Sequence, residues 1–412
     1  MNIGLFGGSF DPVHNGHISM IKGALKSGIV DIVIVIPAVR NSFKRGHILS
    51  PAPYRYYMTA EVLEDEFKKN VFISDIEFFM EGISYTANTV AALSGKDKIA
   101  SFLKGKGFSE SKAGESHRYY WICGTDILPS FDKWYKPDEI VKTAALLVAR
   151  RPGDTTDITS EKKRLKAVLP DIKIKTFEIK GIEASSSDIR KRQDFDDVPK
   201  AALDFIREHD LYESRKVLDE VSEEAAESFM EYAIALYPYL REKRLLHTLN
   251  VGLLSAKLAL IHGADADKAL IAGELHDCAK EIDRDTQRRY AQEACGDLFE
   301  DEKLIHSPAG AVMAERFFGV DDKEILDAIT YHTTGRGDMT LLDKIVYLAD
   351  KIEPARTYTD LTPIREASVK DLNAALGMCV EAVTEKFKRQ GRELHPYTSA
   401  FAESIKFRGS SR

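Results

Sequence analysis

The sequence predicts two domains, an N-terminal α/β domain built on a parallel sheet and a C-terminal domain made only of helices. A chain of 412 residues is longer than a single hydrophobic core usually serves. Up to residue 212, short apolar runs alternate with amphipathic patterns, which is typical of a parallel sheet with helices on both faces. Beyond residue 225, apolar residues recur every three or four positions, the spacing of a helix face.

The elements of the N-terminal domain follow from local patterns. Strands are expected at the short apolar runs, at residues 2–6, 31–36, 71–74, 119–123 and 144–149, with a weaker run at 172–177. Amphipathic helices are expected between them, at residues 16–27, 53–68, 86–93, 160–168 and 187–191. Because parallel sheets bind ligands at the carboxyl ends of their strands, we expect the site of this domain at that edge.

The remaining segments set the domain boundaries. Residues 94–116 are rich in Lys, Gly and Ser and predict an exposed insertion with a short helix. The charged segment 213–224 predicts a linker between domains 1–212 and 225–412. In the second domain, helices are expected at residues 242–262, 265–280, 301–318, 322–332 and 341–352. We expect the mixed segment after Glu393 to be frayed.

Composition argues against several classes of protein. The 58 Lys and Arg residues against 65 Asp and Glu residues give a net charge of −7, which disfavours a nucleic-acid partner. We find neither a run of about 18 apolar residues nor a signal-like start, so we expect no membrane association. The four cysteines form no CxxC pair, which disfavours a zinc ribbon or a disulfide scaffold and fits the cytoplasm. The oligomeric state stays open.

A glycine turn and two histidines follow the first expected strand. The turn at Gly7 and Gly8 lets the backbone approach a ligand closely, and a helix is expected to begin near Asn15. His14 and His17 are three residues apart, so both can face the helix N-terminus, where amide groups and the helix dipole favour an anion. Two imidazoles at such a site suit a polyphosphate. The alternative is a pair of surface histidines on a helix cap. The pattern is neither a Walker A loop nor a GxGxxG turn.

The string GGSFDPVHNGH, residues 7–17, resembles the signature of the nucleotidylyltransferase superfamily in its nicotinate-nucleotide adenylyltransferase branch, which has a Rossmann-like fold. Five further motifs carry the resemblance in order: GISYTANT at 82–89, WICGTD at 121–126 followed by Trp134, RRPG at 150–153, ASSSDIR at 184–190, and the helix pattern of 199–212. Asn41-Ser42-Phe43-Lys44 departs from the usual Pro-Pro-His-Lys and keeps only the lysine, Lys44.

The resemblance implies a reaction and a set of residues for the first domain. It implies transfer of AMP from ATP, with Mg²⁺, to nicotinate mononucleotide, which yields nicotinic acid adenine dinucleotide and pyrophosphate. The implied roles are catalysis by His14, His17, Lys44 and Arg190; nucleotide binding by Gly7, Gly8, Ser9, Phe10, Gly124, Asp126, Ser186 and Ser187; and acceptor binding by Ser84, Tyr85, Thr86 and Trp134. Simpler interpretations are core packing for Trp134 and helix capping for Ser84–Thr86 and Ser186–Ser187. Another acceptor nucleotide is a further alternative.

The second domain spreads histidines and aspartates over several expected helices. His276-Asp277 is preceded by His247 and followed by His306, His332 and Asp350, each within or beside an apolar run. Buried charges on separate helices need partners, and a shared metal ion supplies one. Imidazole and carboxylate ligands suit Fe, Mn or Zn, and the lack of cysteine ligands disfavours a structural zinc. The alternative for any one of these histidines is a satisfied core residue.

These positions, with HSPAGA at 306–311, YHTTG at 331–335 and ADKIEPAR at 349–356, resemble an HD-domain metal-dependent phosphohydrolase of the branch that cleaves diadenosine tetraphosphate symmetrically. The resemblance implies that His247, His276, Asp277 and Asp350 bind one iron and that Asp277, His306 and His332 bind a second, with Asp277 bridging. It further implies that a metal-activated hydroxide attacks phosphorus to give two ADP, while Lys280 and Arg356 contact substrate phosphates. One or two ions remain possible. In the alternative, this domain acts on another nucleotide or senses one.

Overall fold

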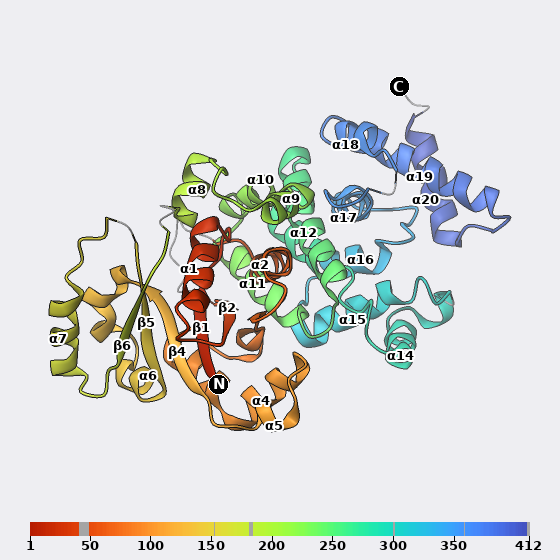
Figure 1. Ribbon diagram of the computed structural model, residues 1–412. Helices are drawn as coiled ribbons and strands as arrows, with labels where there is room; N and C mark the ends of the chain where they lie inside the picture. Colours follow the sequence, from red (N-terminus) through yellow and green to blue (C-terminus); the bar gives the residue numbers. More distant parts are fainter. Residues whose placement is uncertain (41–48, 152, 181–183, 300, 358, 410–412) are drawn as a thin grey trace. The chain divides into compact units, whose positions relative to one another are not determined.

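The computed structural model describes residues 1–40, 49–151, 153–180, 184–299, 301–357 and 359–409 (Figure 1). The chain forms two compact units, Met1–Ile206 and Arg207–Arg412. The segment expected to be a linker is folded into the second unit. It holds the end of α10 (Leu211–Ser214), all of η3 (Arg215–Asp219) and the start of α11 (Glu223–Leu236). Val217 and Leu218 are buried there, which explains why this charged stretch is ordered.

The first unit is built on a six-stranded parallel sheet in the order β3-β2-β1-β4-β5-β6. The strands are β1 (Asn2–Gly8), β2 (Ile32–Pro37), β3 (Val71–Ile73), β4 (Arg118–Gly124), β5 (Ala144–Arg150) and β6 (Ile174–Glu178). Every residue of β2 is buried, as expected for a β-branched strand covered on both faces. The strand order reverses between β1 and β4, and ligands of such sheets bind at this point. The predicted α/β class is therefore confirmed.

Helices cover both faces of the sheet (Figure 1). They are α1 (Asn15–Lys26), α2 (Ala52–Glu66), η1 (Ile76–Phe79), α3 (Thr86–Ser94), η2 (Thr125–Lys133), α6 (Pro137–Thr143), α7 (Ile158–Val168), α8 (Ser186–Arg192) and α9 (Lys200–Glu208). The insertion expected at 94–116 forms two helices, α4 (Lys96–Gly105) and α5 (Glu110–Ala113), and most of its residues are exposed as predicted. Ile99, Leu103 and Ala113 are buried in the main core of the unit.

The second unit is helical throughout its described residues, as predicted. Its further elements are α12 (Glu242–His262), α13 (Ala266–Leu275), α14 (Arg284–Cys295), η4 (Gly296–Leu298), α15 (His306–Phe318), α16 (Lys323–Tyr331), α17 (Leu341–Ile352), α18 (Thr362–Ser368), α19 (Leu372–Arg389) and α20 (Pro396–Gly409). α12 and α13 approach closely at a glycine pair, because a Cβ on Gly273 would lie 2.8 Å from the Cα of Gly252. This close approach brings the side chains of the two helices to a common interior.

Three helix limits differ from the sequence expectation. The helix expected to reach residue 280 ends at Leu275, so Asp277 lies beyond the helix. The helix expected from residue 301 begins at His306, where Pro308 occupies the first turn and needs no amide partner. The segment expected to fray after Glu393 contains α20, and its Phe401 is fully buried. One apolar side chain at that depth anchors the helix in the core.

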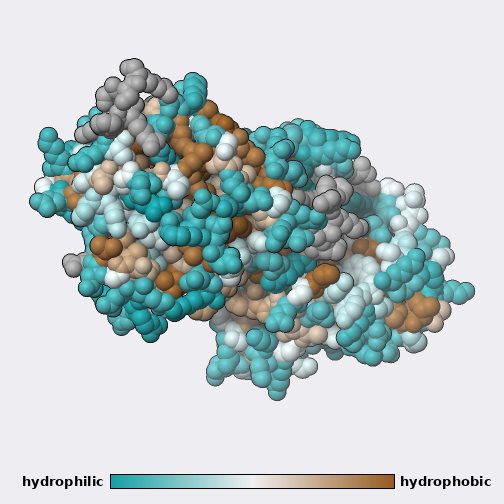
Figure 2. All heavy atoms as spheres, turned by 180° about the vertical axis from the view of Figure 1, so that it is seen from behind, coloured by the Kyte–Doolittle hydropathy of each residue, from teal (hydrophilic) through white to brown (hydrophobic). Residues whose placement is uncertain are grey.

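α12 is the one described helix that is long and apolar enough to cross a membrane, judged by length and composition alone. Within its most apolar window, 72% of the residues are buried inside the unit, and the helix carries the buried polar residues His247 and Asn250. These features are typical of a core helix. On the face that Figure 2 shows, hydrophilic residues predominate and apolar residues gather in a few patches between them.

Candidate nucleotide pocket and candidate metal centre

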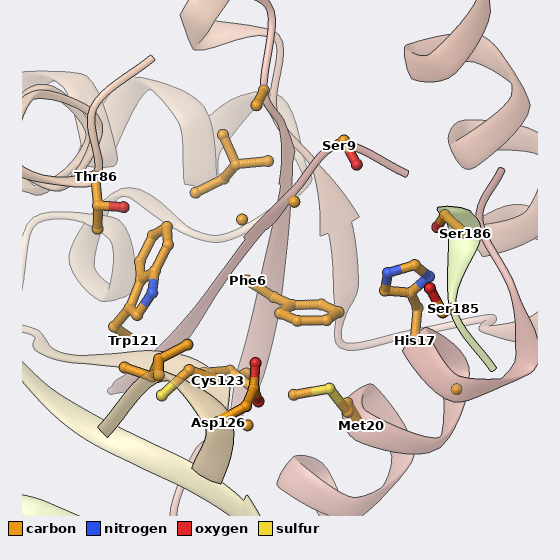
Figure 3. A pocket seen from close by; sticks show the side chains of 18 of the residues that line it. Phe6, Ser9, His17, Met20, Thr86, Trp121, Cys123, Asp126, Ser185 and Ser186 are labelled. Carbon is orange, nitrogen blue, oxygen red and sulfur yellow. The ribbon is translucent and has the colours of Figure 1, made fainter. Parts of the chain in front are cut away.

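A cavity of about 560 Å³ opens at the carboxyl ends of β1 and β4, where the strand order reverses. Many of the residues expected at the nucleotide and acceptor sites line it: Gly7, Gly8, Ser9, His14, His17, Ser84, Thr86, Gly124, Asp126, Trp134, Ser186 and Ser187. Figure 3 shows Thr86 beside Trp121 on one side of the pocket, and His17 beside Ser185 and Ser186 on the other. The pocket therefore has an aromatic end and a polar end.

Position 7, which lines this pocket, admits only glycine. A Cβ there would lie 2.5 Å from the indole ring of Trp121, so no side chain fits. The backbone of β1 therefore passes directly against the ring. Trp121, which the sequence interpretation did not single out, thus lines the pocket together with Trp134 and Phe6. Trp134 also packs on Phe131, with ring centroids 5.3 Å apart, so core packing and pocket lining both apply to it.

His14 and His17 form a stacked pair at the start of α1, with ring centroids 3.7 Å apart. His14 is the N-cap, and its backbone amide donates to Nδ1 of His17 over 3.2 Å. Burial, together with the positive charge of Arg151, lowers the pKa of His14 to about 4. Burial and the neighbouring His14 hold the pKa of His17 well below its ordinary value. Both imidazoles are thus neutral at pH 7 and can act as hydrogen-bond donors rather than as cations.

Arg151 supplies the positive charge that the neutral imidazoles do not. It lines the pocket and lies close enough to lower the pKa of both histidines. Arg151 belongs to the RRPG motif, but the sequence predicted no role for it. A guanidinium binds phosphate oxygens with two parallel hydrogen bonds, so its presence beside a helix N-terminus completes an anion site.

Several expected residues lie elsewhere. Phe10 is buried beneath the pocket, and its ring packs on those of His17 and Phe6 at 4.8 and 5.6 Å. The Tyr85 ring stacks on Tyr135 at 4.4 Å and is not among the lining residues. Arg190 donates to the backbone carbonyl of Asp11 and lies 3.7 Å from its carboxylate, so it braces the loop before α1. Lys44 and Pro152 are outside the described residues.

The aromatic end of the pocket is held by a buried hydrogen-bond network. The hydroxyl of Ser84 accepts hydrogen bonds from the backbone amides of Val39 and Arg40. The Glu77 carboxylate accepts one from the same Val39 amide over 3.0 Å and one from the hydroxyl of Thr89 over 2.6 Å. These bonds join the loop after β2 to the start of α3. They therefore fix the position of Thr86, which lines the pocket from the first turn of α3.

In the second unit, the six residues expected to bind metal converge in one buried cluster. They come from α12 (His247), the end of α13 (His276 and Asp277), the start of α15 (His306), the end of α16 (His332) and α17 (Asp350). Two groups have all their ligand atoms within 4.8 Å of one another, namely His247–His276–Asp350 and His276–Asp277–His332. His276 belongs to both groups, whereas the sequence resemblance implied Asp277 as the bridge.

Helix ends orient two of the imidazoles. His276 and His332 are C-cap residues, and Nδ1 of each lies 2.6 or 2.7 Å from the carbonyl oxygen three residues earlier, in Gly273 and Ile329. A carbonyl only accepts, so Nδ1 carries the proton in both rings. The lone pair of Nε2 then faces the cluster. Nε2 of His276 is buried and makes no hydrogen bond with the described residues, as expected of a ligand atom directed at a cation.

His306 has a different environment from the other imidazoles. Its Nε2 lies 3.1 Å from an oxygen of Asp277, and both ring nitrogens lie about 3 Å from the Lys280 ammonium. It does not belong to either group of possible ligands. Burial lowers the pKa of His306 to about 4. Lys280, expected to contact substrate, is thus placed at the cluster beside this ring.

Buried carboxylates give the cluster its negative charge. Burial alone would raise the pKa of Asp277, but the neighbouring His276 and His306 hold it well below its ordinary value. Asp350 is likewise held ionised, chiefly by Lys351, whose Nζ lies 2.6 Å away. Ionised oxygens and neutral imidazole nitrogens are the donors that borderline divalent ions prefer, so the residues fit such an ion.

Cationic side chains surround the same carboxylates. Arg244 donates to Asp277 over 2.5 Å, and Arg356 donates to Asp350 over 2.9 Å. Arg356 was expected at this site, whereas Arg244 and Lys351 were not. The sequence could have pointed to them only by their position next to expected ligands, because Lys351 follows Asp350 and Arg244 precedes His247 by three residues. Glu353, within the ADKIEPAR motif, was also missed, and its carboxylate lies 3.1 Å from Nδ1 of His247.

Comparison with known proteins matches both units to families. The family model "Cytidylyltransferase-like" matches residues 5–192, and the "HD domain" model matches residues 244–355. The HD match implies binding of a divalent metal, and the possible ligand groups described above lie in or beside the matched residues.

Three curated relatives illustrate the similarity. The "Bis(5'-nucleosyl)-tetraphosphatase, symmetrical" of Halalkalibacterium halodurans is 37% identical over 40% of this chain and 89% of its own. The "Probable nicotinate-nucleotide adenylyltransferase" of Aliarcobacter butzleri is 35% identical over 38% of this chain and 75% of its own. The "Probable nicotinate-nucleotide adenylyltransferase/Ap4A hydrolase" of Mycoplasma pneumoniae is 25% identical over 92% of this chain and 98% of its own.

Proposed function

The chain belongs to the nicotinate-nucleotide adenylyltransferase family through its first half and to the symmetrical bis(5'-nucleosyl)-tetraphosphatase family through its second, and we propose that it carries out both reactions. In the first, a phosphate oxygen of nicotinate mononucleotide attacks the α-phosphorus of ATP, and the bond to the β-phosphate breaks to release pyrophosphate. In the second, one water cleaves diadenosine tetraphosphate into two ADP. The observations that support the proposal are a pocket lined by the motif residues of the first unit and a buried cluster of possible metal ligands in the second, each inside its own matched family region.

In the adenylyltransferase, we propose that the polar end of the pocket holds the phosphates. Neutral His14 and His17 donate hydrogen bonds at the N-terminus of α1, and Arg151, Ser186 and Ser187 line the same pocket. No covalent enzyme intermediate is needed, so positioning and charge stabilisation account for catalysis. Mg²⁺ is proposed to arrive with ATP. Thr86 and the two tryptophans would receive the pyridine ring at the aromatic end.

In the hydrolase, we propose that His247, His276, Asp277, His332 and Asp350 hold the ion or ions. A divalent ion bound there supplies positive charge that polarises a phosphoryl oxygen and lowers the pKa of water. Arg244, Lys280, Lys351 and Arg356 surround the cluster and are proposed to bind the polyphosphate chain. Iron is our first candidate, with Mn and Zn as alternatives, since imidazole and carboxylate ligands suit all three. We also propose a cytoplasmic location, which the four unpaired cysteines support.

One set of assays on the full chain tests both reactions. The protein is treated with a chelator, desalted, and supplied with Mg²⁺ alone or with Fe²⁺, Mn²⁺ or Zn²⁺. We expect Mg²⁺ to restore pyrophosphate release from ATP with nicotinate mononucleotide, and a transition metal to be needed for ADP formation from diadenosine tetraphosphate. Nicotinamide mononucleotide serves as the matched acceptor. Absence of pyrophosphate release with either acceptor would contradict the first assignment, and hydrolysis unaffected by chelation would contradict the second.

A further inference from the structure

We propose that Glu353 is a positioning residue for His247, and that Asn250 and His209 hold Glu353 in place from behind. The inference rests on the metal centre proposed above. Neither the family matches nor the resemblance assigns these side chains to the metal centre. They contact His247 or one another, and would therefore affect the metal only through His247.

The contacts form a continuous buried chain. Oε1 of Glu353 lies 3.1 Å from Nδ1 of His247. Its other oxygen, Oε2, accepts a hydrogen bond of 2.8 Å from the Asn250 side-chain amide and one of 2.8 Å from the backbone amide of Ala355. The Asn250 amide nitrogen also lies 3.0 Å from Nδ1 of His209. Glu353 and Asn250 are only 2% exposed, so water does not compete for these bonds.

The chemistry of the groups fixes the direction of each bond. A carboxylate only accepts hydrogen bonds, so Asn250 must present its NH₂ group to Glu353, and its second hydrogen is then directed at His209. Nδ1 of His209 must accept, which agrees with the burial that lowers the pKa of this imidazole. At the other end, Nδ1 of His247 must carry the proton that Glu353 receives. Nε2 of His247 then faces the cluster, 3.1 Å from Asp350.

His247 differs in this respect from two of its neighbours. His276 and His332 are oriented by backbone carbonyls at the ends of their own helices. His247 lies in the interior of α12, where the carbonyls are already bonded within the helix, so a side chain must provide its acceptor. A charged acceptor also makes the imidazole a stronger base, and such partners of metal-bound histidines typically change metal affinity by about 10–100-fold.

Glutamine at position 353 is the sharpest test. Glutamine has the size of glutamate, but its side-chain NH₂ group can only donate hydrogen bonds. This NH₂ group must therefore face another donor, either the Nδ1 proton of His247 or the amides of Asn250 and Ala355. We expect Glu353→Gln to weaken Mn²⁺ binding by the full chain about 10–100-fold, measured by calorimetric titration. Asn250→Leu, which removes the donor behind Glu353 and leaves the His247 contact, should weaken it less. Glu366→Gln, at an exposed carboxylate of α18, is the matched control and should bind Mn²⁺ as the wild type does.

Thermal unfolding separates positioning from a merely structural role. A positioning residue should reduce the increase in Tm that Mn²⁺ produces, whereas a structural residue should lower Tm equally with and without the ion. Equal Mn²⁺ affinity and an equal Mn²⁺-dependent increase in Tm for Glu353→Gln and the wild type would overturn the inference. If Glu353→Gln does not fold, Asn250→Leu decides in the same way. A wild type that binds none of Mn²⁺, Fe²⁺ and Zn²⁺ would overturn the metal centre itself, and the inference with it.

Discussion

Glu274, on α13, has a carboxyl group that is completely enclosed. Both of its oxygens are buried and make no hydrogen bond with the described residues. Burial, with no compensating charge, therefore raises the pKa of Glu274 well above its ordinary value. The group binds a proton more tightly in the folded chain than in the unfolded chain. Such a carboxyl stabilises the fold at low pH, and this contribution is lost as the pH rises above the unfolded value of about 4.5.

Glu274→Gln should remove this pH dependence. The amide cannot ionise, so the variant keeps its stability at pH 8, where the wild type must hold a buried proton or bury a charge. We expect a Tm for the variant that exceeds the wild-type Tm by a few degrees at pH 8 and matches it near pH 4.5. Thermal scans monitored by helical circular dichroism at both pH values measure this. The exposed Glu366→Gln provides the control, and parallel pH profiles for wild type and Glu274→Gln would contradict the argument.

The buried pair His14 and His17 makes stability depend on pH in the opposite direction to Glu274. Both pKa values are lowered by burial, so the unfolded chain takes up protons below pH 6.5 and the folded chain does not. The free energy of unfolding of the first unit should therefore fall as the pH is lowered from 6.5 toward 4. His14→Asn, which keeps a good N-cap, should lose less stability over this range. Tm values at pH 7.5 and pH 5 for wild type, His14→Asn and the control His117→Asn test this, and identical losses would contradict it.

Several residues of the metal cluster lie at helix ends rather than in helix interiors. His276 and His332 cap the ends of α13 and α16, and His306 begins α15. Periodicity identifies helices but marks their ends poorly, so the sequence predicted a helix running through His276 and Asp277. The structure ends it at Leu275, and the ring of His276 bonds back to the Gly273 carbonyl, which has lost the partner that a further helical turn would have supplied. Pattern alone does not reveal such a bond.

The capping box of α17 offers a test of one such helix end. Thr340 accepts from the amide of Asp343, whose carboxylate accepts from the amide of Thr340. Thr340→Ala removes one of these bonds and should cost about 1 kcal/mol, or about 2–4 °C in the Tm of a unit of this size. Thr340→Ser keeps the hydroxyl and should stay within about 0.5 kcal/mol of the wild type. Equal Tm values for both variants would show that the box contributes nothing.

At the scale of the whole molecule, strands and pocket edges were predictable for a physical reason. Runs such as residues 32–36 are apolar because both faces of a central parallel strand are covered, and the loop after such a strand meets the ligand. Residues that act through tertiary contact were not predictable. Arg151 reaches the pocket from the end of β5, Trp121 from β4 and Glu353 from the turn after α17, and although each lies in a recognised motif, its role depends on contacts that the local sequence does not show. Arg190 was assigned to the pocket, yet it braces Asp11.

Two separate sites predict separable activities. His17→Ala removes a lining imidazole from the first pocket and should reduce adenylyl transfer about 100-fold or more, with hydrolysis unchanged. Asp277→Ala removes a buried carboxylate shared by the metal cluster and should abolish hydrolysis and leave adenylyl transfer unchanged. Steady-state assays of both reactions on each variant measure this. Loss of both activities in a variant whose circular dichroism spectrum and Tm match the wild type would contradict the two-site arrangement.

The hydrogen bonds of His276 and His332 to backbone carbonyls determine which substitutions would disturb the orientation of the metal ligands. The acceptor of His332 is the main-chain carbonyl of Ile329, so a change of the Ile329 side chain does not remove it. The acceptor of His276 is also a main-chain carbonyl, but a Cβ on Gly273 would lie 2.8 Å from the Cα of Gly252, so this position admits only glycine. His247 depends instead on the carboxylate of Glu353. Random mutagenesis should therefore find ligand orientation sensitive to replacement at positions 273 and 353 and tolerant of replacement at position 329.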